Sequence, residues 1–369
     1  MATRPTLVVF LGGLGSGLAE RMVAGARLAA STDSIKEALT GQAYAGAIVA
    51  TDNPYLDMGL PGVVVDSDHG TYHFGQRLAR LIRERQLDSV VYMGGGSATL
   101  LRHDDFADIA RRRNGGVAVT NNLFSSDLVA FPAHPQTLAV LETVERDNAL
   151  ARALAEAAQL AVEELPRSLA TQMDIDSPTD LAVLKLADLG GGYLGPYLGT
   201  LDLDLDRYER VLPLFLDRKS QIVVAGRVSS FAWQYLERQT ACRVRLFAEE
   251  RGLEADGRVD DGTARSLLGF LLESVGIESF FSKLAELGDA AFIDTRVLLA
   301  HMGIAAGRED RFLSDLGCWK DIDQPFLREF TQAACTAPIP VILGGHSLMS
   351  GGLMALNEFA WQQSEAGSK

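Results

Sequence analysis

The stretch Thr6-Leu-Val-Val-Phe-Leu-Gly-Gly-Leu-Gly-Ser-Gly17 joins a short apolar run directly to a glycine-rich segment. The apolar run is typical of a buried strand, and glycines after such a strand let backbone N–H groups approach an anion closely. The helical pattern that follows would turn the positive end of its dipole toward the same place. The stretch therefore predicts a strand, a phosphate-binding turn and a helix in succession.

This glycine loop has several interpretations. It lacks the lysine of the GxxxxGK[ST] pattern, which excludes a P-loop NTPase. A dinucleotide site would use Gly12, Gly15 and Gly17 as a GxxGxG variant, but no acidic residue ends a second strand about twenty residues later. A tight strand-to-helix turn without a ligand is a further alternative.

Short apolar runs alternate with helical patterns along the first 190 residues. The predicted strands are Thr6–Leu11, Ala45–Ala50, Gly62–Val65, Ser89–Tyr92 and Gly116–Val119. Strands separated by helices of ten to fifteen residues favour βαβ units and a mainly parallel sheet. The segment Pro135–Leu165, rich in Ala, Glu and Leu, is predicted to be helical.

A cluster of residues that end regular structure, Gly190-Gly-Gly-Tyr-Leu-Gly-Pro196, marks the predicted domain boundary. The alternation resumes beyond it, with predicted strands at Gln221–Ala225, Arg243–Phe247, Ala290–Ile293 and Pro340–Leu343. A length of 369 residues also suits two domains. We therefore expect two α/β domains, residues 1–190 and 191–369.

The composition narrows the choice of partners and compartment. A formal net charge of −14 argues against a nucleic-acid-binding protein, which needs clustered Lys and Arg. No apolar run approaches the length of a membrane span, and none resembles a signal peptide. Three widely spaced cysteines indicate a reducing compartment. We expect a cytoplasmic protein, and the composition allows either a monomer or a homo-oligomer.

The string Phe10-Leu-Gly-Gly-Leu-Gly-Ser16 resembles the nucleotide-binding loop of the sugar-phosphate, molybdenum-cofactor and phospholactate nucleotidyltransferases, usually GGxGSRM. The matching positions are Gly12, Gly13, Gly15 and Ser16. Gly17 occupies the arginine position, and Arg21-Met22 follow four residues later.

A second segment, Met173-Asp-Ile-Asp-Ser-Pro-Thr-Asp-Leu181, is similar to the DIDTPEDL segment of the same family. In that family the first acid helps to hold the metal bound to the nucleotide, and Asp174 takes this position. The segment also reads as a plain helix start, because Ser177 suits the N-cap and Pro178 the first turn.

The resemblance implies a Rossmann-like mixed sheet flanked by helices (GT-A type) in the N-terminal half. It also implies transfer of NMP from an NTP to a small phosphorylated acceptor with Mg²⁺, in which Asp174 organises the metal. In such an enzyme Arg21 or Arg27 would offset the phosphate charge. This sequence departs from the family pattern at two places. It lacks the lysine that usually follows the glycine loop, and it lacks the acid that usually follows the central strand. Gly94-Gly-Gly-Ser97 stands where that acid is expected.

Asp66-Ser-Asp-His-Gly-Thr-Tyr-His73 is the alternative metal cluster. It follows a predicted strand, so that it lies at a carboxyl end, where open α/β sheets bind ligands. Asp66 and Asp68 would replace the missing acid, with His69 and His73 as further ligands. Histidines in a polar loop are otherwise solvated.

Other glycine turns and polar residues complete the predicted binding set. Gly94, Gly95 and Ser97 would form a close-approach turn. Asn121 would contact a base or ribose, or simply shape a turn. In the C-terminal half, a strand leads into Gly345-His346-Ser347, which would present N–H and hydroxyl groups to an anion.

Three functions remain open from the sequence. The first, toward which the resemblance inclines, is a nucleotidyltransferase-like enzyme acting on a nucleotide and a small phosphorylated metabolite. The second is a noncatalytic protein that binds a nucleotide or phospho-metabolite. The third is a different α/β enzyme with its site in the C-terminal half, around Arg227, Glu249, Asp294 and His346.

Overall fold

The chain divides into two compact units in the computed structural model, which describes residues 4–13, 15–68, 70, 72–112, 117–251, 257–259 and 261–367. The first unit comprises Met1–Leu14, Ala24–Gln172 and Gly191–Leu194. The second comprises Gly15–Val23, Met173–Gly190 and Gly195–Lys369. Compared with a boundary after residue 190, this division places residues 15–23 and 173–190 in the second unit and residues 191–194 in the first.

The first unit is built on a seven-stranded sheet. Its strands are β1 (Thr6–Phe10), β2 (Gly46–Thr51), β3 (Val63–Ser67), β4 (Ser89–Gly94), β5 (Ala118–Thr120), β6 (Leu128–Pro132) and β7 (Val162–Glu164). Its helices are α1 (Leu18–Thr40), whose first residues group with the second unit, α2 (Phe74–Glu84), α3 (His103–Arg112), α4 (Pro135–Leu141), the 3₁₀ helix η2 (Asp147–Ala149), α5 (Leu150–Glu156) and α6 (Leu169–Gln172). The strand order is β3-β2-β1-β4-β6-β5-β7, and β6 runs antiparallel to both of its neighbours.

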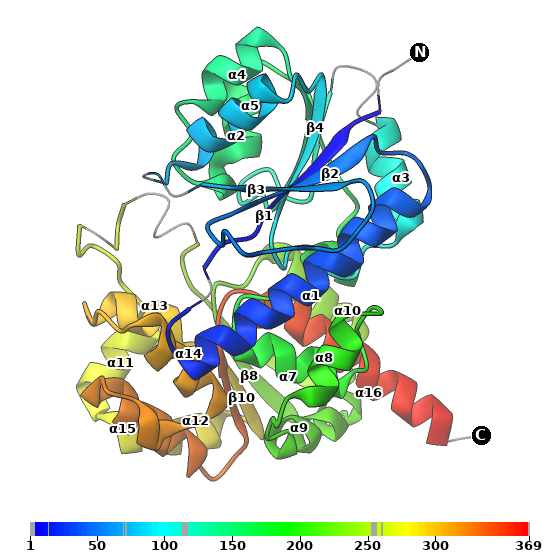
Figure 1. Ribbon diagram of the computed structural model, residues 1–369. Helices are drawn as coiled ribbons and strands as arrows, with labels where there is room; N and C mark the ends of the chain where they lie inside the picture. The colour runs from blue at the N-terminus through cyan, green and yellow to red at the C-terminus, as the bar shows by residue number, and fades with distance from the viewer. Residues whose placement is uncertain are drawn as a thin grey trace. The chain divides into compact units, whose positions relative to one another are not determined.

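Both faces of this sheet are covered by helices (Figure 1). Ile35 of α1 and Phe106 of α3 pack on one face, and Leu78 of α2 and Leu150 of α5 pack on the other. The central strand β1 is accordingly apolar on both sides, as is typical of a parallel strand between two helical layers. This arrangement leaves the loops at the strand ends as the places for polar side chains.

The predicted long helix over Pro135–Leu165 is wrong. The chain forms α4, turns, forms η2 and α5, and ends in the strand β7. The turn is fixed because the carbonyl of Val144 accepts the N–H of Gly75 at 3.0 Å. Residues 162–164 are drawn into the sheet because they pair with the edge of β5. Tertiary hydrogen bonds thus override a helical composition.

The second unit contains a four-stranded parallel sheet. Its strands are β8 (Gln221–Gly226), β9 (Arg243–Ala248), β10 (Ala290–Asp294) and β11 (Val341–Gly344). Its helices are α7 (Pro178–Leu186), α8 (Leu194–Thr200), α9 (Asp206–Leu216), α10 (Ser230–Gln239), α11 (Leu267–Val275), α12 (Ile277–Leu287), α13 (Thr295–His301), α14 (Arg308–Leu316), the 3₁₀ helix η3 (Trp319–Asp321), α15 (Pro325–Cys335), the π-helix η4 (Leu348–Gly352) and α16 (Leu353–Gly367).

The strand order of this second sheet is β11-β10-β8-β9. The chain moves from β8 outward to β9 and then returns to the other side of β8, so that the order reverses between β8 and β10. Helices α11, α12 and α15 contribute Leu272, Phe281 and Phe330 to the core on one face. The predicted fold class, two α/β domains of which the first has a mixed sheet flanked by helices, is confirmed.

Within the predicted breaker cluster, a buried carboxylate of the first unit binds the chain. Asp33 of α1 accepts the N–H groups of Tyr193 at 2.9 Å and Leu194 at 2.8 Å. A Cβ on Gly191 would lie 2.4 Å from the Asp33 carboxyl carbon. Asp33 therefore explains both the glycine and the return of this short segment to the first unit.

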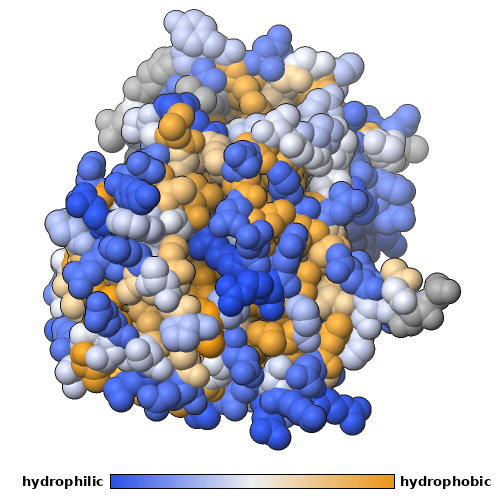
Figure 2. Space-filling model, turned by 90° about the horizontal axis from the view of Figure 1, so that it is seen from below, coloured by the Kyte–Doolittle hydropathy of each residue, from blue (hydrophilic) through white to orange (hydrophobic). Residues whose placement is uncertain are grey.

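Figure 2 shows hydrophilic residues mixed with hydrophobic ones on one face of the molecule, as is usual for folded chains. Among the helices of the described residues, none combines the length and the apolar character required to cross a membrane.

The packing of α2 against the turn after α4 gives a direct test of the fold. A Cβ on Gly75 would lie 1.7 Å from the carbonyl oxygen of Leu141, a backbone atom that a rotamer change does not move away. We expect Gly75→Ala to lower the free energy of unfolding by about 1–3 kcal/mol, measured by urea denaturation. Gly41→Ala is the control, since nothing lies within 4 Å of its new methyl group; an equal loss in both variants would contradict this packing.

Candidate functional site

Two glycine turns meet where the strand order of the first sheet reverses. The chain runs from β1 outward to β2 and β3 and then places β4 on the other side of β1. The N–H of Gly95, after β4, donates to the carbonyl of Phe10 in β1 at 2.8 Å. A Cβ on Gly95 would lie 2.7 Å from the Leu11 side chain. The predicted residues Gly94 and Gly95 thus lie beside the start of the glycine loop.

A carboxylate already occupies the first half of the glycine loop. The N–H of Gly13 donates to both oxygens of Asp52, at 3.1 and 3.3 Å. Asp52 comes directly after β2, so it lies at the same carboxyl edge of the sheet. Sequence reasoning missed this residue, although the signal, an acid after a predicted strand, was the one that selected Asp66.

Another carboxylate lies near the turn after β4. Asp147, the first residue of η2, accepts the hydroxyl of Tyr92 at 2.8 Å. A Cβ on Gly94 would be 3.8 Å from the same Asp147 oxygen and 2.9 Å from the hydroxyl of Ser97. Burial and the Asp147 charge raise the pKa of Tyr92 well above its usual value, so Tyr92 remains a neutral donor. The turn after β4 contains no acidic residue of its own, and Asp147 places a carboxylate beside it.

The second half of the glycine loop lies in the second unit, where Glu20 binds it. The Glu20 carboxylate accepts the N–H groups of Ser16 at 2.7 Å and Gly17 at 3.3 Å. The hydrogen bond from the Ser16 N–H is the largest cause of a lowered pKa of Glu20. Arg21 donates to the carbonyl of Ser16. The predicted residues Ser16 and Arg21 are thus engaged with each other and with Glu20.

Glu309 of α14 caps the start of α1. Its carboxylate accepts the N–H groups of Ala19 at 3.0 Å and Glu20 at 2.9 Å. A Cβ on Gly17 would lie 1.9 Å from the Glu309 carboxyl carbon. The glycine at the position where the resembling family has arginine therefore has a physical reason, because the Glu309 side chain fills that space.

The predicted metal residues Asp66 and Asp68 are engaged by arginines of α2 and its C-terminal end. Asp66 pairs with Arg77 and lies 3.1 Å from Arg85, and Asp68 pairs with Arg80. Burial alone would raise the pKa of Asp66, but the contacts with Arg77 and Arg85 outweigh it, so the pKa is lowered.

The histidines that were grouped with these acids give no support for a metal centre. The ring of His73 caps α2 by accepting the N–H of Gln76 at 3.3 Å, and His69 lies outside the described residues. In the described ranges, no group of three or more His, Cys, Asp or Glu side chains is arranged to hold a metal ion. A metal role for Asp66 and Asp68 stays a prediction.

Asn121 shapes a turn of the first unit. Its side-chain oxygen accepts the N–H groups of Asp127 at 3.1 Å and Leu128 at 3.2 Å. The side chain is buried. These bonds fix the chain between β5 and β6, and a contact of Asn121 with a base or ribose stays a prediction.

In the second unit, the predicted residues Asp174 and Ser347 lie together. The Ser347 hydroxyl donates to the Asp174 carbonyl at 2.7 Å and lies 3.3 Å from the Asp174 N–H. Next to them, His346 lies 3.2 Å from a guanidinium nitrogen of Arg251. Burial, followed by the charges of Arg227 and Arg251, lowers the pKa of His346 to about 4, so that the ring is neutral at physiological pH.

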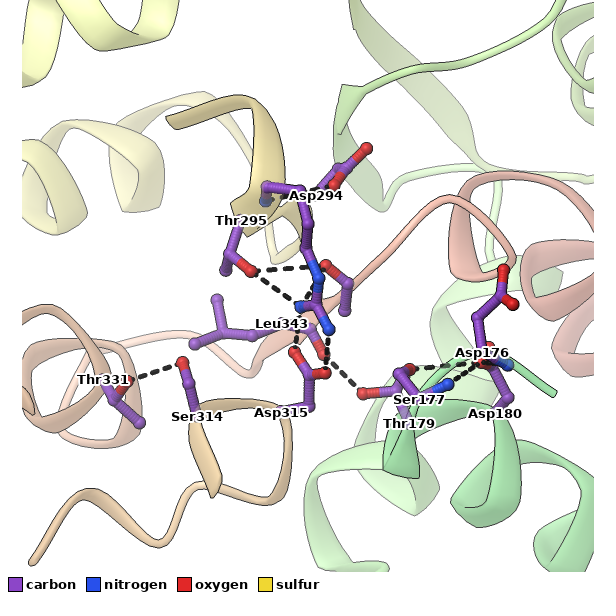
Figure 3. A network of polar contacts seen from close by, with 12 residues as sticks. Asp176, Ser177, Thr179, Asp180, Asp294, Thr295, Ser314, Asp315, Thr331 and Leu343 are labelled. Carbon is purple, nitrogen blue, oxygen red and sulfur yellow. Dashed lines mark hydrogen bonds and ion pairs between the residues drawn. The ribbon is translucent and has the colours of Figure 1, made fainter. Parts of the chain in front are cut away.

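Two ion pairs with fully buried carboxylates lie at the carboxyl edge of the second sheet, and Figure 3 shows the polar network around Asp294 and Asp315. Arg296 pairs with Asp315 at 2.5 Å and also donates to the carbonyl of Gly344 at 3.1 Å. Asp294, the last residue of β10, binds the guanidinium of Arg227 through both oxygens, at 2.6 and 3.1 Å. The charges of Arg227 and Asp294 also act on His346, so these three residues of the third interpretation of the sequence lie near one another; an active site formed by them stays a prediction.

Glu249, the fourth residue of that interpretation, is bonded to Ser266 at 2.6 Å. The start of α7 joins the same polar region, because the Thr179 hydroxyl donates to the carbonyl of Leu343 at 2.6 Å. Asp294 and Arg296 come at the end of a predicted strand, so the sequence itself indicated polar side chains at this edge of the sheet. The partner of Arg296, Asp315, lies on α14 and carried no local pattern.

Asp180 caps α7 from a fully buried position. One of its oxygens accepts the N–H groups of Asp176 at 2.9 Å and Ser177 at 2.7 Å, and with the predicted N-cap Ser177 it forms a capping box. Burial and the charge of Asp176 nevertheless raise the pKa of Asp180 to about 8. The side chain therefore carries a proton at neutral pH.

No protein-family model matches this chain, and no curated protein matches it. Among solved structures, the chain is similar to a cytidylyltransferase from Leptospira borgpetersenii serovar Hardjo-bovis, with 16% sequence identity and a TM-score of 0.37, over 50% of this chain and 87% of that one. The fold class therefore rests on the strands and helices of this chain.

The buried Asp180 predicts how stability depends on pH. Its pKa is near 3.8 in an unfolded chain and about 8 in the folded one, so between these values only the folded state holds the proton. The contribution of Asp180 to stability is complete below about pH 4 and is lost as the pH rises through about 8. We expect Asp180→Asn to remove this part of the slope in urea unfolding between pH 5 and pH 8.

Asp104→Asn is the matched control, because the Asp104 side chain is 91% exposed. The slope of this variant should equal that of the unmodified chain. An unchanged slope in Asp180→Asn would show that Asp180 is ionised in the folded protein.

Proposed function

We propose that this chain is a nucleotidyltransferase-like protein that binds an NTP with Mg²⁺ at the glycine loop and transfers NMP to a small phosphorylated acceptor. The observation that carries the proposal is the meeting of two glycine turns at the reversal of strand order in the first sheet, through the bond from Gly95 to Phe10. Open α/β sheets bind ligands at this position. The loop sequence Gly12-Gly-Leu-Gly-Ser16 agrees with it.

The contacts of the loop support an affinity for anions. Gly13 binds Asp52 in the first unit, and Ser16 and Gly17 bind Glu20 in the second. A carboxylate and a phosphate accept hydrogen bonds from backbone N–H groups in the same way. We infer that phosphate oxygens replace some of these carboxylates when a nucleotide binds.

Magnesium would enter with the nucleotide as part of the substrate. Mg²⁺ bound to phosphates takes only one or two carboxylates from a protein, and Asp52 and Asp147 are carboxylates at the carboxyl edge of the first sheet. Asp66 and Asp68 fit this role less well, because arginines already neutralise them. The resemblance also assigns Asp174 to the metal, and this remains part of the proposal.

The reaction would be an in-line displacement. A phosphate oxygen of the acceptor attacks the α-phosphorus of the NTP, the bond to the β-phosphate bridging oxygen breaks, and pyrophosphate leaves with the electron pair. The metal ion would neutralise charge on the phosphates. The chain would orient the triphosphate through loop N–H groups and Arg21.

A noncatalytic binding protein is the second candidate. It is favoured by the occupation of the loop by Asp52 and Glu20, and by the absence of an acid in Gly94-Gly-Gly-Ser97. The two candidates differ in turnover. Both predict stabilisation by a nucleotide, and only the enzyme releases pyrophosphate.

We expect at least one NTP with Mg²⁺ to raise the unfolding temperature, because a ligand that binds only the folded state stabilises it. With a phosphorylated acceptor, Mg²⁺-dependent release of pyrophosphate should follow and be lost in Asp174→Asn. Asp104→Asn, an exposed carboxylate on α3, is the control. Stabilisation without pyrophosphate would leave the binding protein, and no response to any NTP would contradict both candidates.

The cap on α1 predicts that Glu309 opposes nucleotide binding. Its charge lies on the Ala19 and Glu20 N–H groups, directly after the loop, and repels an incoming triphosphate. We expect Glu309→Gln, which keeps an acceptor oxygen, to lower the Kd for the NTP about fivefold at low salt, measured by calorimetry. Glu286→Gln, exposed on α12, should leave the Kd unchanged; weaker binding in Glu309→Gln would refute the repulsion.

A further inference from the structure

A cavity of about 350 Å³ lies in the second unit at the place where its strand order reverses. Its wall includes Arg227, which directly follows β8, and Arg296, which follows β10 by two residues. β8 and β10 are parallel neighbours. This is the same topological position that the glycine turns occupy in the first sheet, and ligands of open α/β sheets are found there.

The charged part of the wall is made of arginines. Arg311 of α14 joins Arg227 and Arg296, and none of the described residues that line the cavity is acidic. The carboxylates paired with two of these arginines, Asp294 and Asp315, have side chains that are 0% exposed. The acids are therefore buried away from solvent, and the arginines rather than the acids line the cavity.

The two paired arginines are ordered before a ligand arrives. Asp294 accepts the backbone N–H of Arg227 at 3.4 Å and of Arg296 at 3.2 Å, besides the Arg227 guanidinium. Arg296 is bonded to Asp315 through both terminal nitrogens. Binding to such prearranged groups loses little side-chain entropy, and a guanidinium fork matches the oxygens of a phosphate.

The rest of the wall is apolar. Val297, Leu299 and Ile304, from α13 and the segment after it, contribute to it. The volume is at the lower end of the range for small-molecule sites, about 300–1,000 Å³. The combination suits a small molecule with one strongly anionic group and a short carbon skeleton.

We propose that this cavity binds a small organic phosphate monoester, with the phosphate on Arg227 and Arg311 and the carbon part against Val297 and Ile304. A dianionic phosphate matches several guanidinium groups better than a monoanionic carboxylate does. The site belongs to the second unit alone, and it does not depend on nucleotide binding at the glycine loop.

Calorimetric titration of the full chain with glycerol 3-phosphate tests the proposal. We expect saturable binding that is weakened about tenfold or more in Arg311→Gln, because a charged hydrogen bond is lost. Arg210→Gln is the matched control, since it removes the same charge from an exposed position of α9. Equal affinities of the two variants, or no binding to the unmodified chain, would overturn the site.

Ala305→Trp tests the apolar part without a change of charge, because Ala305 lines the cavity and is itself exposed. It should abolish binding of glycerol 3-phosphate, and it decides the outcome if Arg311→Gln does not fold. Succinate bound as tightly as glycerol 3-phosphate would overturn the preference for phosphate. Displacement of glycerol 3-phosphate by an NTP would assign the binding to the glycine loop and overturn the cavity site.

Discussion

Backbone N–H groups that no strand or helix can use must find acceptors, and carboxylates supply them throughout this protein. Asp52 serves the loop after β1, Glu309 the start of α1, and Asp180 the start of α7. Each of these carboxylates accepts backbone N–H groups at the start of a loop or helix, so each fixes the geometry of a turn. The acidic composition of the chain is thus partly a structural requirement of its strand-to-helix turns, and Asp52 and Glu309 place negative charge next to the loop where an anionic ligand would bind.

Much of the fold could be predicted because it depends on local patterns. The strand β1 and the turn after it follow from an apolar run and glycines, and the cap of α7 follows from Ser177, Pro178 and Asp180. The segment Pro135–Leu165 was mispredicted because its composition is helical and its hydrogen bonds are not local. β7 is a strand only because β5 offers an open edge. Sequence patterns do not contain such long-range pairings.

The candidate site was predictable to the same extent. The sequence predicted a close-approach turn at Gly94 and Gly95, and Gly95 does lie against Phe10 and Leu11; ligand binding by this turn stays a prediction. Glu309 could not be found, because 289 positions separate it from the N–H of Glu20 that it binds. The ion pairs of Asp66 and Asp68 were missed for a related reason. Arg77, Arg80 and Arg83 recur along α2, yet the first two pair with Asp66 and Asp68 and the third with Glu142; a pattern of charges alone does not show which acid each one meets.

The contact of Asp33 with Tyr193 and Leu194 has a consequence for how the chain can be divided. The chain passes back and forth between the two units, because residues 15–23 and 173–190 belong to one and residues 191–194 to the other. Neither unit is a continuous stretch of sequence. A cut near Gly190 would remove the partners of Asp33 from the first unit and the α7 segment from the second. Each half is therefore expected to fold cooperatively only with the other half present.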